Sequence, residues 1–165
     1  MVDTKTAKKI GQRLAIKSAL IGIVVAYIIF GGLIFSWDLK IFKAIFWIFD
    51  VHFWYHLLIG AFGLLIMAYL FGQQAGVEII LKNRNELLTG IKYGFFTLLL
   101  GTLIGSTVGF IEEGIDNIGD FGNPFFDYYF KPMYWVTIFG IVPVVIVGIW
   151  FGRQIKKQGL NIQGD

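Results

Sequence analysis

Four uncharged apolar segments, each about as long as a bilayer is thick, constrain this chain more than any other feature. A helix needs about 20 predominantly apolar residues to cross the hydrocarbon core. A backbone in lipid must also satisfy its hydrogen bonds within a helix or a closed barrel. The segments contain 20, 27, 19 and 21 residues: Ser18–Trp37, Val51–Val77, Tyr93–Ile111 and Pro132–Gly152. The sequence therefore predicts an all-α integral membrane protein, a four-transmembrane-helix bundle with spans at about 16–37, 52–75, 92–111 and 132–152.

The composition leaves no room for a second, soluble domain. Of the 165 residues, 56% are hydrophobic, and almost all lie in the four spans or their short connections. Soluble domains usually need about 50 residues or more, so we expect a single transmembrane domain over 1–165. This excludes a membrane-anchored soluble enzyme and nucleic acid as a partner. Because the chain has no cysteine, disulfides, thiolate metal sites and iron–sulfur clusters are excluded as well, and we expect no cofactor.

Charge is distributed asymmetrically between the two ends of the spans. The segments up to residue 17, from 78 to 92 and from 153 onward hold eleven basic and four acidic residues, a net charge of +7. The opposite side holds three basic and seven acidic residues, a net charge of −4. The positive-inside rule then predicts that both termini lie in the cytoplasm. The compact format and the charge bias favour a multi-pass protein of the cell inner (plasma) membrane, with an organelle membrane as the alternative. The basic residues would face anionic lipid headgroups.

The chain resembles itself at a spacing of about 80 residues. A shift of 80 places five residues of the second span on identical residues of the fourth: Gly60, Ile66, Phe71, Gly72 and Gln74 on Gly140, Ile146, Phe151, Gly152 and Gln154. A shift of 79 places Gly22 and Ala26 on Gly101 and Gly105. Two tandem helical hairpins would explain these matches, and chance similarity between apolar helices is the alternative.

Glycines at a spacing of four form one face of the third span. Gly101, Gly105 and Gly109 lie on the same side of a helix, and small residues at this spacing let another helix come close. We expect the face to pack within the chain, with contact between two copies as the alternative. In the fourth span, Pro143 removes a backbone hydrogen bond and predicts a kink.

Two histidines offer the only pattern of metal-ligand type. His52 and His56 are one helical turn apart, and Glu112 and Glu113 end the third span on the same side. Imidazoles and carboxylates at one depth are ligands suited to zinc or copper. Ordinary histidines among the aromatic residues of a membrane interface are the favoured interpretation, and a metal site is the alternative.

The function favoured by these patterns is non-catalytic. No Asp, Glu, Lys or Arg lies in the middle of a span, although such residues mark most ion and proton pathways. Two features favour an accessory or scaffold subunit of a larger membrane complex. The third span has glycines suited to helix packing, and aromatic residues are concentrated on the side opposite the basic one. The partners of such a subunit would be membrane lipids and other membrane-protein subunits, or a second copy. Alternatives are a metal-binding membrane protein using His52 and His56, and a small transporter or channel lined by four hydroxyl residues: Thr97, Thr102, Ser106 and Thr107.

The charge asymmetry generates a topology prediction. Cysteines introduced at Thr4 and at Gln158 should not react with an impermeant thiol reagent in intact cells, because both sites lie on the basic side. A cysteine at Asn117 should react. Labelling from outside at Thr4 would reverse the assignment, and labelling after lysis controls for accessibility.

Overall fold

The computed structural model describes residues 2–50, 54–115 and 123–164, and these residues form helices joined by short connections, without strands. In chain order the elements are α1 (Thr4–Asp38), α2 (Ile41–Asp50), α3 (Trp54–Gly76), η1 (Val77–Leu81), α4 (Glu86–Gly109), η2 (Phe110–Gly114), η3 (Phe126–Phe130) and α5 (Lys131–Gly164). The three η elements are π-helical turns. Four helices are long and apolar enough to cross a membrane, which confirms the predicted all-helical class.

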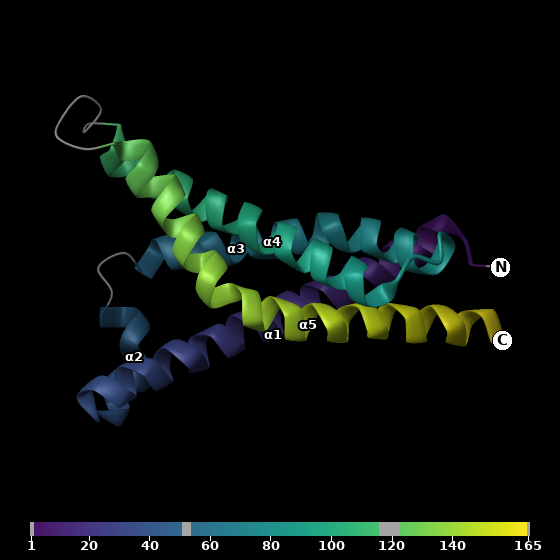
Figure 1. Cartoon of the computed structure of the whole chain (residues 1–165), viewed down its shortest axis with the longest axis horizontal. Coiled ribbons are helices and arrows are strands. Elements are labelled where there is room, and N and C mark those ends of the chain that lie inside the picture. The colour runs from purple at the N-terminus through teal and green to yellow at the C-terminus, as the bar shows by residue number, and fades with distance from the viewer. Residues whose placement is uncertain (1, 51–53, 116–122, 165) are drawn as a thin grey trace.

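The long helices form a bundle in which neighbours follow chain order. α1 packs on α3, α3 on α4 and α4 on α5, and a smaller contact between α5 and α1 closes the ring. Both termini lie at one end of the bundle, where the helices are close together, and the helices spread apart toward the other end (Figure 1). The end with the termini and the 82–85 turn is called the basic end here. The end with α2, η2 and η3 is called the acidic end.

Polar side chains begin the helices at the basic end. The Asp3 carboxylate accepts a hydrogen bond of 2.9 Å from the amide of Thr6, in the first turn of α1. Hydrogen bonding from Thr6 also holds the pKa of Asp3 below its ordinary value. Asn85 caps α4 in the same way, accepting from the amides of Leu87 and Leu88 at 2.9 and 3.1 Å. Such caps satisfy amides that the first helical turn leaves without partners.

The buried core lies toward the basic end. Its buried residues come from all four long helices and η1: Ile10, Leu14, Ala15, Ala68, Ala75, Ile79, Tyr93, Phe151 and Ile155. The core therefore coincides with the region where the helices converge, and the splayed acidic half contributes little to it. Toward that half, α5 changes direction (Figure 1), and Pro143 lies inside this helix. A bend at an interior proline is expected because its ring displaces the preceding turn.

Small residues bring the backbones of α1 and α3 into contact. A β-carbon added at Gly72 would lie 2.5 Å from the Ala15 side chain and 2.7 Å from the Gly11 carbonyl oxygen. Added at Gly11, it would meet the backbone of Gly72 and Gly76. Real β-carbons essentially never come closer than 3.0 Å to such atoms. Any larger residue at these positions would therefore push the two helices apart.

The crossing of α4 and α5 repeats this arrangement. A β-carbon at Gly90 would meet the backbone of Gly148 and Gly152, and one at Gly148 would lie 3.0 Å from the Gly90 carbonyl oxygen. Gly90 lies 79 positions after Gly11, and Gly148 lies 76 positions after Gly72. The shift from α1 to α4 equals the 79-residue sequence match of these spans, whereas the shift from α3 to α5 is four residues, about one helical turn, shorter than their 80-residue match. A stripe of small residues spaced by four matches itself after a shift of four, so the sequence alone could not choose between these registers.

The two crossings generate a stability prediction. Gly72→Leu and Gly90→Leu should each lower the melting temperature of the purified chain in detergent, because overpacking typically costs about 1–3 kcal/mol. Gly22→Leu is the matched control, since no atom lies within 4 Å of the β-carbon position there. If Gly22→Leu lowered the melting temperature as much as Gly72→Leu and Gly90→Leu do, that result would contradict the two crossings.

Candidate functional site

A histidine and a carboxylate meet at the acidic end, where α3 begins and α4 continues into η2. His56 Nε2 lies 3.2 Å from Glu112 Oε2, and the Tyr55 hydroxyl donates a 2.8 Å hydrogen bond to the same oxygen. The ring of Tyr55 also lies against that of His56, with 4.2 Å between centroids. The His56 side chain is only 16% exposed. One carboxylate oxygen therefore joins two neighbouring residues of α3 to η2.

The neighbouring carboxylate, Glu113, is bound to a different element. Its Oε2 accepts a 2.8 Å hydrogen bond from the hydroxyl of Tyr128 in η3. Gly109 makes room for this arrangement, since a β-carbon there would lie 3.2 Å from the Tyr128 ring and 3.6 Å from the His56 ring. Glu112 and Glu113 thus connect η2 to α3 and to η3, respectively.

Of the four residues predicted as metal ligands, the structure brings His56 and Glu112 together and directs Glu113 to Tyr128. His52 lies outside the described residues. Across the described part of the chain, no group of three or more His, Cys, Asp or Glu side chains could hold a metal ion. Zinc sites use three or four protein ligands. The metal site therefore remains a prediction that depends on His52.

The glycine face of α4 is occupied by α3 and η3 of the same chain. A β-carbon at Gly101 would lie 2.6 Å from the Leu64 side chain, and one at Gly105 would lie 3.1 Å from the α-carbon of Gly60. Gly109 faces His56 and Tyr128, as described above. The geometry is that of packing within one chain.

Two of the four hydroxyl residues considered for a transport pathway form hydrogen bonds within their own helix. Thr102 and Thr107 each donate a 2.8 Å hydrogen bond to the carbonyl oxygen four residues earlier, on Leu98 and Leu103. Such bonds occupy the donors of threonines in a helix. These two side chains therefore do not offer free donors to a solute.

The acidic half of α1 and the short helix α2, residues 20–50, are called the α1–α2 arm here. The Tyr27 hydroxyl donates a hydrogen bond to the carbonyl of Ile45 and so holds α2 against α1. Large apolar side chains of the arm are exposed, including Trp37 at 93% and Phe42 at 75%. Figure 1 shows the end of α1 and α2 diverging from the start of α5. None of the residues of the arm belongs to the buried core.

A polar network at the basic end escaped the sequence reasoning. Lys92 Nζ lies 2.7 Å from Glu78 Oε2, and Lys156 Nζ lies 3.0 Å from Glu86 Oε2. A signal was present in the composition. Only four acidic residues lie among eleven basic ones on this side, and two of them flank the 82–85 turn. Isolated acids in a basic region are good candidates for specific ion pairs.

The acidic-end cluster generates a prediction about metal. Purified protein should contain zinc and copper well below one ion per chain, because the described residues offer too few ligands. His56→Ala should leave that content unchanged. Elemental analysis of both proteins, purified without chelators, measures this. Stoichiometric metal that is lost in His56→Ala would support the site formed with His52.

No protein-family model, curated protein or solved structure matches this chain.

Proposed function

We propose that this chain is a non-catalytic accessory or scaffold subunit of a larger complex in the bacterial inner membrane, with both termini in the cytoplasm. In this proposal the four apolar helices cross the membrane as two tandem hairpins. The α1–α2 arm binds a transmembrane helix of a partner subunit. The charge difference between the two ends supports the orientation, and the repeated glycine crossings support the hairpins.

The observation that carries the proposal is a comparison of two equivalent glycines. The space beside Gly101 of α4 is occupied by the Leu64 side chain of α3. Gly22 of α1 lies 79 positions before Gly101, and no atom lies within 4 Å of its β-carbon position. Gly32, farther along the arm, is open in the same way. Helices in membranes associate through close packing at small residues, because lipid supplies no hydrophobic force between them. A partner helix would supply at Gly22 the contact that α3 supplies at Gly101.

Exposed aromatic residues of the arm support the same conclusion. Aromatic side chains are enriched at protein interfaces, and Trp37, Phe42 and Phe49 are all more than two-thirds exposed. Aromatic residues also anchor helices at the membrane surface, so this surface serves both purposes. The proposal of a partner helix depends mainly on the open glycines, because anchoring to lipid does not require glycine at these positions.

The test places a photo-crosslinking amino acid at Val24 or Ile28 of the arm, both exposed, and activates it in native membranes. We expect a cross-linked product of defined mass that survives purification and contains one other membrane protein. Ile146 of α5 is equally exposed and is the matched control position, where cross-linking should reach lipid.

A second variant separates specific docking from chance contact. Gly22→Leu should reduce the arm cross-link severalfold while leaving the melting temperature of the isolated chain unchanged, because the added side chain meets nothing in this chain. A product with twice the mass of the chain would show that the arm binds a second copy of this chain and not a different subunit. Equal cross-linking from the arm and from Ile146, unaffected by Gly22→Leu, would reject the proposal.

A further inference from the structure

A cavity of about 630 Å³ lies on the side of the bundle near the basic end, between α1, α3, η1 and α4. This volume is typical of sites that hold a small molecule. Its apolar part is formed by Met67, Leu70, Phe71 and Leu100. Leu70 is 45% exposed and Leu100 36%, so the cavity opens sideways, toward the surroundings of the bundle.

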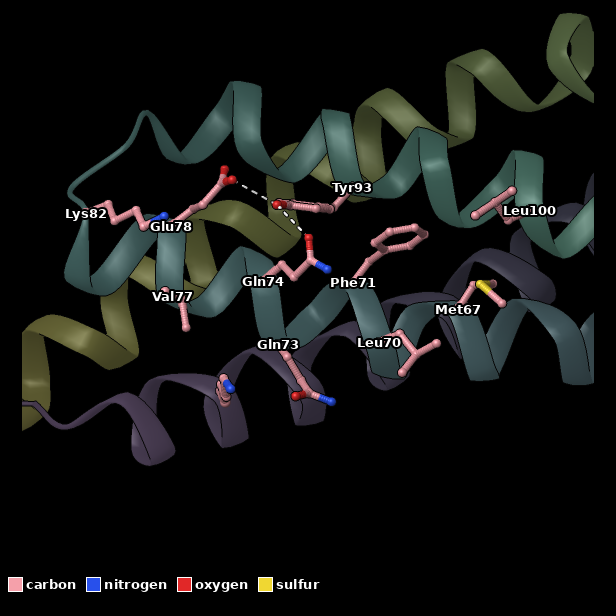
Figure 2. Close-up of a pocket in the computed structure, with 11 residues that line it drawn as sticks. Met67, Leu70, Phe71, Gln73, Gln74, Val77, Glu78, Lys82, Tyr93 and Leu100 are labelled. Carbon is pink, nitrogen blue, oxygen red and sulfur yellow. Dashed lines mark hydrogen bonds between the residues drawn. The ribbon is translucent and has the colours of Figure 1, made fainter.

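The lining changes from apolar to charged along the helix axis. Figure 2 shows Met67 and Leu100 at one end, Gln74 and Tyr93 in the middle, and Lys82 at the other end. From Met67 to Lys82 the chain rises about 22 Å at 1.5 Å per residue. One leaflet with its headgroup layer is about 20–22 Å thick. The gradient and its length match those of one phospholipid molecule.

The acidic residue in the cavity is already neutralised by the protein. Glu78 Oε2 lies 2.7 Å from Lys92 Nζ, and Glu78 Oε1 accepts a 2.9 Å hydrogen bond from the Tyr93 hydroxyl. The same hydroxyl lies 3.3 Å from Gln74 Oε1 (Figure 2). This partly exposed carboxylate is paired with an ammonium group and a hydroxyl, so it repels a nearby anion less than an unpaired carboxylate would. The network instead forms a fixed polar wall halfway along the cavity.

Two further lysines determine the charge of the polar end. Lys8 of α1 and Lys82 after η1 both line the cavity, and neither forms an ion pair with any described residue. Lys8 follows Ala7, whose carbonyl contacts Gly76 at the α1–α3 crossing. The backbone contact between these helices thus places residue 8 beside the end of α3. The polar end consequently carries two ammonium groups in addition to the Glu78–Lys92 pair, next to the amide of Gln73.

We propose that this cavity binds a phospholipid with a net-anionic headgroup, its phosphate near Lys8 and Lys82 and one acyl chain along Met67, Leu70 and Leu100. Basic pockets between membrane helices recognise anionic headgroups through this charge complementarity. The amide of Gln73 can donate to a phosphate or ester oxygen. The site is independent of the α1–α2 arm and takes a lipid of one class rather than bulk lipid.

The experiment uses the full chain in nanodiscs that contain equal amounts of phosphatidylglycerol and phosphatidylcholine. Native mass spectrometry of the released protein measures which lipid stays bound. We expect one retained phosphatidylglycerol, and about tenfold weaker retention in the double variant Lys8→Gln/Lys82→Gln. The matched control is Lys9→Gln/Arg84→Gln, which removes the same charge from exposed residues outside the cavity and should retain the lipid.

Two additional measurements distinguish a lipid site from an anion site or a charged surface. Leu70→Trp, at an exposed lining position, should fill the apolar half and reduce retention without changing the charge. Soluble glycerol phosphate, which has no acyl chain, should neither bind at micromolar concentration nor displace the lipid. Equal losses in the two charge variants, or tight binding of glycerol phosphate alone, would overturn the proposal. Melting temperatures near that of the parent chain would exclude unfolding as the cause.

Discussion

Direct backbone contact between helices at small residues is the interaction on which the rest of this structure depends. In the hydrocarbon core there is no hydrophobic driving force between apolar helices, so their association depends on close van der Waals packing. Gly11 with Gly72, and Gly90 with Gly148, bring α1 to α3 and α4 to α5 at the basic end. The buried core lies in the same region. Away from these crossings α1 separates from α5 (Figure 1), while α3 and α4 stay in contact through Gly101 and Gly105, and the acidic half of α1 is left with open surfaces.

The ion pairs between described residues lie at the two ends of the bundle. At the basic end, Glu78 pairs with Lys92 and Glu86 with Lys156. At the acidic end, Glu112 contacts His56. Charged side chains are costly inside the hydrocarbon core unless they are paired or reach water. With these pairs at the ends, the helices contact their neighbours in the middle mainly through the packing of apolar and small residues. Binding of lipid and binding of a protein partner can then occupy separate parts of the same chain.

The sequence predicted the four long apolar helices, because span length and hydropathy depend only on local composition. It also placed His56 and Glu112 at one depth, but their 3.2 Å approach depends on how α3 and α4 are rotated about their axes. Rotation is set by packing, which a single helix does not encode. For the same reason Gly11, Gly90 and the lipid-sized cavity were missed, since each becomes distinctive only when its neighbouring helix is in place.

The order of neighbours in the ring has a consequence for biosynthesis. α3 can pack on α1, α4 on α3 and α5 on α4 as each helix leaves the ribosome, because every one of these pairs is consecutive among the long helices. Contacts between segments close in sequence form quickly, as loop closure costs little entropy. The contacts of α5 with α1 and with η1 join more distant parts of the chain. These contacts can form only after α5 has been synthesised, so the seam between the first and last helices stays open until then and is accessible to an assembly factor or to misassembly.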